Sequence, residues 1–114
     1  MADVTITAQN LSVAGITPSF TAVSAIADDF YLSNNGHVLL HVNNASAGSI
    51  DVTITGNNNC DQGYTHDETI SVGAGVEKII GPFSVARFND NSTGKILINF
   101  DTATDVSYTA YKGV

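Results

Sequence analysis

Apolar and polar residues alternate with a period of two in several ranges along the chain. In the ranges 37–42, 50–55 and 96–100 every second residue is Val, Leu, Ile or Phe, and the ranges 4–7 and 106–110 show the same alternation. Successive side chains of a strand point to opposite faces of a sheet, so each range predicts a strand with one apolar face.

Turn residues separate these ranges. Asn34-Asn35-Gly36 and Gly73-Ala74-Gly75 contain the residue types that accept the positive φ of tight turns. The second turn predicts a hairpin between strands at 69–72 and 76–80. Pro82 has no N–H for a ladder and is therefore expected at a sheet edge or a crossover. The range 85–88 is predicted to be a further short strand.

Residues 11–36 lack the alternation. Gly15 and Pro18 interrupt the pattern, so the region is predicted to be a loop with one strand near Phe20. A single helical turn over 22–29 is the alternative. The whole chain then has about seven to nine short strands with turns between them, which is typical of an antiparallel β-sandwich or a closed barrel. No repeat or linker divides it, so residues 1–114 are expected to form a single domain.

The charge balance narrows the choice of partners. The net charge is −7 with only four basic residues, and these are scattered, which argues against binding nucleic acid or an anionic membrane surface. No leader-like or membrane-spanning apolar run is present. Cys60 is the only cysteine, so no intramolecular disulfide can form, and synthesis in a cytoplasm is expected.

Three histidines and Cys60 are the first candidates for chemistry. His37 and His41 are four residues apart, which on a strand separates their Cα atoms by about 13 Å, too far to bind one metal ion. A metal site with His66 and Cys60 is the remaining option. Cys60 as a nucleophile with His66 as its base is disfavoured, because the neighbouring Asp61 would raise the pKa of the thiol. We therefore expect no metal site and no cofactor.

The carboxylates do not form a recognisable catalytic pair. They cluster only as Asp28-Asp29, Asp67-Glu68 and the pair Asp101 and Asp105, and glycosidic cleavage needs two carboxylates across a cleft. The loop from Asp90 to Gly94 resembles a calcium loop in composition but lacks the closing acidic residue. No phosphate-binding loop or nucleophile elbow is present. The chain is therefore not expected to be an enzyme.

Aromatic side chains are the remaining candidates for a contact surface. Tyr64 is expected in a loop and Tyr111 is out of phase with Tyr108, so Tyr64 and Tyr111 are predicted to be the exposed aromatics. Exposed tyrosines anchor interfaces because they bury a large area at a small entropic cost. The sequence alone does not define the protein interface.

Read over its full length, the chain resembles small head proteins of tailed bacteriophages. The residues that carry the likeness are Asp29-Phe30, Asn34-Asn35-Gly36-His37-Val38-Leu39-Leu40-His41-Val42-Asn43-Asn44, Ile50-Asp51-Val52-Thr53-Ile54, Ile70-Ser71-Val72-Gly73-Ala74-Gly75, Ile79-Ile80-Gly81-Pro82-Phe83, Phe88-Asn89 and Val106-Ser107-Tyr108-Thr109-Ala110. These are strand and turn patterns in a common order. They are similar to those of capsid decoration, or cement, proteins.

The resemblance implies a jelly-roll-like β-sandwich that binds the major capsid protein on the outside of the assembled shell, often as a homotrimer. The expected location is then the virion, on the capsid surface, after synthesis in the host cytoplasm. The resemblance transfers no functional residue. Two other functions stay open: a carbohydrate-binding β-sandwich module, against which the absence of Trp counts, and a small tail or connector component.

Overall fold

The computed structural model describes residues 2–58, 62–63 and 66–113. Within these residues the chain forms ten strands and one short helix. Their bounds are β1 (Asp3–Ile6), β2 (Gln9–Asn10), β3 (Thr21–Ala22), β4 (Asp29–Ser33), β5 (Val38–Asn44), β6 (Ile50–Ile54), β7 (Glu68–Val72), β8 (Glu77–Ile80), α1 (Val85–Phe88), β9 (Lys95–Phe100) and β10 (Val106–Lys112).

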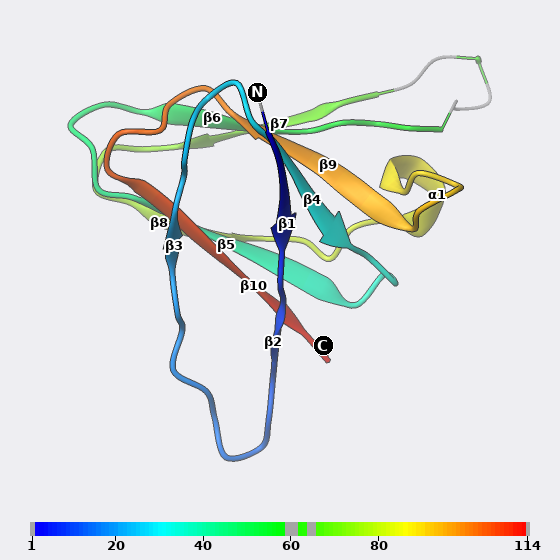
Figure 1. The fold of residues 1–114 in the computed structure, drawn as a ribbon, viewed down its shortest axis with the longest axis horizontal. Coiled ribbons are helices and arrows are strands. Elements are labelled where there is room, and N and C mark those ends of the chain that lie inside the picture. The colour runs from blue at the N-terminus through cyan, green and yellow to red at the C-terminus, as the bar shows by residue number, and fades with distance from the viewer. Residues whose placement is uncertain (1, 59–61, 64–65, 114) are drawn as a thin grey trace.

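The strands form two sheets that pack face to face (Figure 1). One sheet has the order β1-β4-β9-β6-β7, and the other has the order β2-β10-β5-β8 with β3 also paired to β10. Four antiparallel pairs, β3 with β10, β4 with β9, β5 with β8 and β6 with β7, fold the chain as one long doubled hairpin. The hairpin is rolled into two sheets, which is the connectivity of a jelly roll. The predicted all-β sandwich is therefore confirmed.

The two N-terminal strands add a feature that the alternation does not predict. β1 pairs in parallel with β4 at the edge of one sheet, and β2 pairs in parallel with β10 in the other sheet. The segment 3–10 therefore crosses from sheet to sheet and covers one side of the sandwich. Edge strands expose unpaired backbone groups, so this segment protects the sheet edges that it covers.

The core follows from the period-two pattern. The inward residues of β5 and β6 are fully or almost fully buried, as are those of β9 and β10. Between the sheets lies an aromatic cluster in which the Phe30 ring centroid is 5.2 Å from that of Phe100 and 5.4 Å from that of Tyr108, both edge to face. Such ring pairs add stability beyond the area they bury.

The local prediction for residues 85–88 is wrong. Residues 85–88 form the helix α1 rather than a strand, because the Ser84 hydroxyl caps the turn by accepting from the Arg87 N–H at 3.3 Å. Phe88 is the one buried residue of that helix. The prediction of a loop with one strand near Phe20 is confirmed by β3, whereas the alternative of a helical turn over 22–29 is not: these residues contain the end of β3, a turn and the first residue of β4.

The predicted hairpin between 69–72 and 76–80 is also wrong. β7 pairs with β6 in one sheet, whereas β8 pairs with β5 in the other, so the Gly73-Ala74-Gly75 turn connects the two sheets. The amide of Asn44, which is 0% exposed, donates to the carbonyls of Val72 and Gly73, both at 3.0 Å. These hydrogen bonds hold the segment that crosses between the sheets. The prediction failed because the alternation of apolar residues carries no information about which sheet a strand joins.

Candidate functional site

The histidines do not come together. His41 lies on the outer face of β5, where Nδ1 is 2.7 Å from the Tyr111 hydroxyl and Nε2 is 3.1 Å from Glu77 Oε1. Both ring nitrogens are therefore engaged. His37 is exposed in the turn before β5. Cys60, and with it the pairing of Cys60 with His66, lies outside the described residues.

The predicted carboxylate clusters serve the fold. Asp28 accepts from the Ser24 hydroxyl at 2.6 Å and from the Ala2 N–H at 2.9 Å. These hydrogen bonds, led by that from Ser24, lower the pKa of the Asp28 carboxyl. Asp29 accepts from the Asn99 amide at 2.9 Å. Asp28 and Asp29 therefore both accept hydrogen bonds from groups of the fold.

The other carboxylates hold loops. Asp101 accepts from the Asp51 N–H at 2.9 Å, which ties the end of β9 to β6. Asp105 has a φ of 59° and occupies the turn before β10. Asp90 accepts from the N–H groups of Ser92 and Thr93 at 2.8 and 3.1 Å, so its carboxylate organises its own turn. In the described part of the chain no three His, Cys, Asp or Glu residues are grouped to hold a metal ion.

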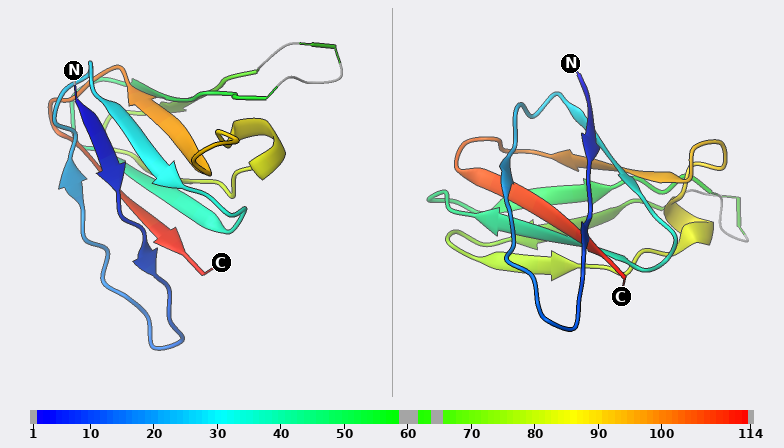
Figure 2. Two further views of the ribbon diagram at one scale, coloured as in Figure 1. Left: turned by 45° about the vertical axis from the view of Figure 1, so that its right-hand side comes forward. Right: turned by 60° about the horizontal axis from the view of Figure 1, so that its bottom comes forward.

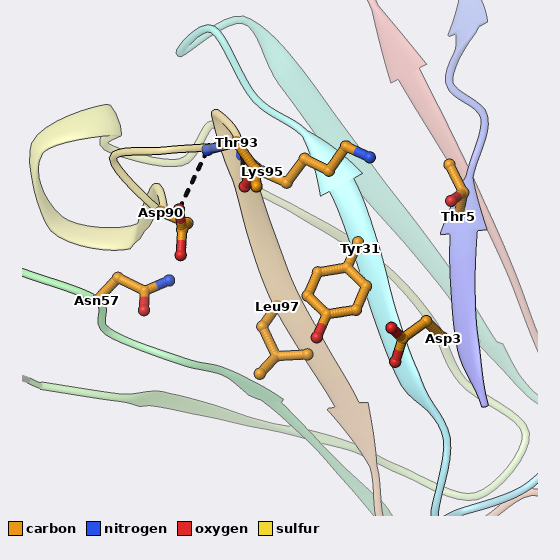
Figure 3. Close-up of a pocket in the computed structure, with 8 residues that line it drawn as sticks. All are labelled: Asp3, Thr5, Tyr31, Asn57, Asp90, Thr93, Lys95 and Leu97. Atoms are coloured by element: carbon orange, nitrogen blue, oxygen red, sulfur yellow. Dashed lines mark hydrogen bonds between the residues drawn. The ribbon is translucent and has the colours of Figure 1, made fainter. Parts of the chain in front are cut away.

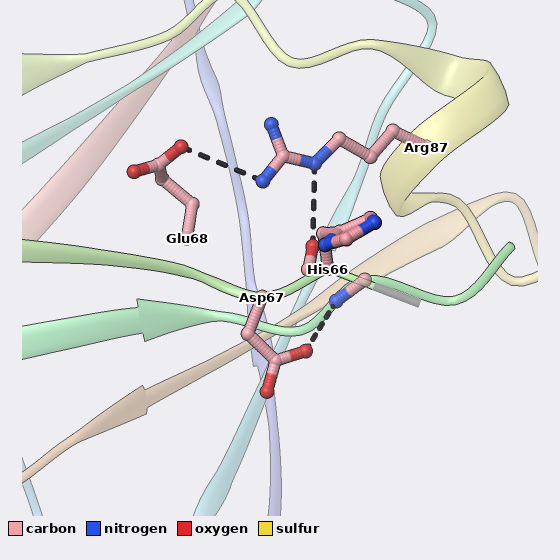
Figure 4. A network of polar contacts seen from close by, with 5 residues as sticks. His66, Asp67, Glu68 and Arg87 are labelled. Carbon is pink, nitrogen blue, oxygen red and sulfur yellow. Dashed lines mark hydrogen bonds and ion pairs between the residues drawn. The ribbon is translucent and has the colours of Figure 1, made fainter. Parts of the chain in front are cut away.

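Asp67 and Glu68 belong to a polar network between the start of β7 and α1 (Figure 4). Asp67 Oδ1 accepts from the Gly56 N–H at 2.8 Å. The Arg87 side chain donates to the His66 carbonyl at 3.2 Å and lies 3.5 Å from Glu68 Oε1. The Arg87 guanidinium also covers the Phe88 ring at 4.5 Å from its centroid. The network fixes α1 against the strand ends.

The most distinctive surface feature is a loop that projects from the sandwich between β2 and β3. We call residues 11–20 the projecting arm; it extends well beyond the sheets in both views of Figure 2. Its apolar side chains are unburied: Leu11 is 41% exposed, Val13 is as exposed as a side chain can be, and Phe20 is 36% exposed. The arm therefore presents apolar surface that the fold does not use.

Gln9 anchors the base of the projecting arm. Its side-chain oxygen accepts from the Ser19 N–H at 3.0 Å and from the Thr109 hydroxyl at 2.9 Å. Its side-chain nitrogen donates to the Thr17 carbonyl at 3.2 Å. One side chain thus joins both limbs of the arm to β10, while the tip is held by the Gly15 N–H donating to the Ser12 carbonyl at 2.9 Å.

Phe20 also anchors the base, through an aromatic contact with the outer face of the sheet. Its ring is edge-on to the His41 ring with centroids 4.9 Å apart, and the His41 ring lies 5.8 Å from that of Tyr111. Tyr111 is only 6% exposed, so the prediction that it is an exposed aromatic is wrong. Tyr64 lies outside the described residues. Phe20, which the alternation did not single out, is an aromatic at the surface.

A second surface feature is a hollow on the outer face of the other sheet (Figure 3). It has a volume of about 460 Å³. We call it the β4–β9 hollow. Its lining residues are Asp3, Thr5, Tyr31, Asn57, Asp90, Thr93, Lys95 and Leu97. They come from β1, β4, β9 and two loops, so residues far apart in the sequence meet here.

Comparisons with known proteins find no family model, no curated protein and no solved structure that matches this chain. No helix in the described ranges has the length and apolar character needed to cross a membrane. The projecting arm and the β4–β9 hollow are therefore interpreted from their own geometry. In the sequence the projecting arm is marked only by apolar residues that do not alternate with polar ones. These residues lie near Gly15 and Pro18.

Proposed function

We propose that this chain is a structural protein of a tailed-phage virion that binds the outside of the assembled capsid and stabilises it. The observation that carries the proposal is the projecting arm, which holds Leu11 and Val13 away from the sandwich with their side chains in solvent. The ordered strand and turn likeness to capsid decoration proteins supports the same function. The partner is the major capsid protein.

The energetics of the projecting arm suit docking. Full burial of a Leu or Val side chain contributes about 1.5–3 kcal/mol, so the arm has apolar surface whose burial is gained only against a partner. An exposed apolar patch is a common mark of an interaction site, and Leu11 and Val13 lie two residues apart on the projecting arm. A segment held at its base by Gln9 reaches a seam between neighbouring subunits that a flat sheet does not reach.

Many weak contacts suffice for this function. Copies bound side by side on a shell act together, so stabilisation grows with the number of contacts without high affinity at any one of them. We propose that the chain acts as a homotrimer at three-fold positions of the shell. The expected location is the virion surface, after synthesis in the host cytoplasm.

The test is binding to empty heads assembled from the major capsid protein encoded in the same genome. The chain is expected to co-sediment with the heads and to raise the temperature at which they break open. Val13→Asp places a charge on the arm and is expected to abolish co-sedimentation. Ala47→Asp changes another exposed residue, in the turn between β5 and β6, and is expected to bind normally. Equal binding by both variants, or absence of the chain from mature virions, would overturn the proposal.

The trimer has a separate test. Cryo-microscopy of decorated heads is expected to show three copies around each occupied three-fold position, with the projecting arms directed at the shell. Density for single copies away from any three-fold axis would contradict the trimer but leave capsid binding intact. Density at the tail or portal alone would favour a tail or connector component instead.

A further inference from the structure

The β4–β9 hollow has features that the projecting arm does not explain. We infer that it is a binding site for a sugar unit, with Tyr31 and Leu97 forming its floor and Asp3, Asp90 and Lys95 forming its polar rim. This function is independent of the capsid role, because the hollow and the projecting arm belong to different sheets and share no residue.

The floor offers an apolar surface of suitable size. Tyr31 and Leu97 are paired across β4 and β9, and Thr5 is paired with Tyr31 on its other side. Phe30 and Leu32 point into the core, so Tyr31 points to the outer face, where it is half-buried. Figure 3 shows the Tyr31 ring beside Leu97. A sugar ring presents a C–H face that packs on an aromatic ring, whereas its hydroxyls need polar partners.

The rim supplies both kinds of hydrogen-bonding group. The carboxylates of Asp3 and Asp90 accept, and the ammonium of Lys95 donates. Among the described residues the Asp3 carboxylate and the Lys95 ammonium have no protein partner, and one oxygen of Asp90 remains after it has bound the Ser92 and Thr93 amides. Hydroxyls both donate and accept, so a polyhydroxylated ligand matches this mixture better than a purely apolar one does.

Tyr31 contributes a donor as well as a ring. Partial burial raises the pKa of its phenol, and the negative charges of Asp3, Asp29 and Asp90 raise it further. A phenol already keeps its proton at neutral pH, and so the Tyr31 hydroxyl is able to donate. A ring with a polar tip is a common element of binding surfaces that are apolar at one end and wet at the other.

The volume and the charge of the β4–β9 hollow limit the kinds of sugar that it is able to bind. A volume of about 460 Å³ lies within the range of about 300–1,000 Å³ found for small-molecule sites. Three carboxylates lie near Tyr31, against the single ammonium of Lys95 in the lining. The balance is negative, so a neutral sugar or one with an amine is favoured, and a sugar acid is repelled.

Titration of the isotopically labelled chain, followed by the NMR shifts of its amides, tests the inference with three probes: D-glucose, D-glucosamine and D-glucuronate. Glucosamine is expected to bind most tightly, with a dissociation constant on the order of millimolar, glucose more weakly, and glucuronate most weakly. The shifts should centre on Tyr31 and Leu97. No shift there with any of the three probes, or tightest binding of glucuronate, would overturn the inference.

Three variants separate binding from folding. Tyr31→Ala should weaken glucose binding at least tenfold, while Tyr31→Phe, which keeps the ring, should weaken it only several-fold. Asp3→Asn removes one of the three negative charges near Tyr31 and should therefore reduce the preference for glucosamine over glucose. Thr69→Ala, an exposed change on β7 of the same sheet, is the matched control and should bind as the unmodified chain does. Unchanged affinity in Tyr31→Ala would contradict the site.

Capsid binding is expected to survive all these changes, so failure of this site is distinguishable from failure of the proposed capsid role.

Discussion

Asn34 and Asn89 bind each other through their side chains in the interior. The Asn34 amide donates to Asn89 Oδ1 at 2.6 Å, and the Asn89 amide donates back to the Asn34 main-chain carbonyl at 2.7 Å. Both residues are 6% exposed. The pair joins the turn between β4 and β5 to the loop between α1 and β9.

Breaking this pair is expected to be costly, because a buried polar group left without a partner loses about 1–3 kcal/mol. Asn89→Ala removes one of the two acceptors of the Asn34 amide, the other being the Phe83 carbonyl, and the donor to the Asn34 carbonyl. It should lower the free energy of unfolding by that amount, measured by urea denaturation. Asn35→Ala, in the exposed turn beside Asn34, is the control and should change stability by less than about 0.5 kcal/mol. Equal effects would show that the buried pair contributes no more than an exposed turn residue.

Gly56 is expected to tolerate no side chain. A Cβ at this position would lie 2.3 Å from the His66 carbonyl oxygen and 2.7 Å from its carbon. Gly56→Ala therefore forces the two segments apart and should destabilise the fold by about 1–3 kcal/mol, read from the thermal midpoint. Gly48→Ala has open space around the new methyl group and is the matched control; a loss of stability there as large as that of Gly56→Ala would refute the steric explanation.

Asp28 should make the fold sensitive to acid. Its folded-state pKa lies below the ordinary value of 3.8 because the Ser24 hydroxyl and the Ala2 amide bind the ionised carboxylate. The stabilisation is therefore present above about pH 4 and is lost as the pH falls through the folded-state pKa. Asp28→Asn should flatten the dependence of the thermal midpoint on pH in this acidic range. A curve as steep as that of the unmodified chain would contradict the assignment.

The anchoring role of Gln9 predicts a local change without a global one. Gln9→Ala removes the acceptor of the Ser19 N–H and the contact with Thr109, so the Ser19 amide should exchange with solvent faster. Most of the core lies away from the projecting arm, so the free energy of global unfolding should change by less than about 1 kcal/mol. Hydrogen exchange followed by NMR measures both. Unchanged exchange at Ser19 would show that Gln9 does not hold the arm.

The strands at 38–44, 50–54 and 95–100 follow from the alternation of apolar residues, because that alternation is the direct result of burying one face of a sheet. Sheet membership does not follow from it: β7 and β8 have the same local pattern as a hairpin but join different sheets. The sequence does not predict the helix at 85–88, because a single helical turn capped by Ser84 is too short to show a helical period of apolar residues.

The candidate sites are less predictable from the sequence than the strands are, because they depend on tertiary structure. The β4–β9 hollow joins residues from Asp3 to Leu97, and no local pattern relates positions so far apart in the sequence. The burial of Tyr111 has the same origin, since its outward face is covered by the arm base through Phe20 and His41. The arm itself had a weak signal, an apolar segment without strand period, which the sequence interpretation assigned to an ordinary loop.

The place of β10 in its sheet has a consequence for biosynthesis. This strand, the nearest to the C-terminus, bonds to β5 on one edge and to both β2 and β3 on the other. Residues 1–105 are therefore synthesised before that sheet is able to close, and the earlier strands wait with their apolar faces uncovered. Chains dominated by such distant pairings fold slowly, so truncation just before Val106 should yield aggregates rather than a smaller stable domain.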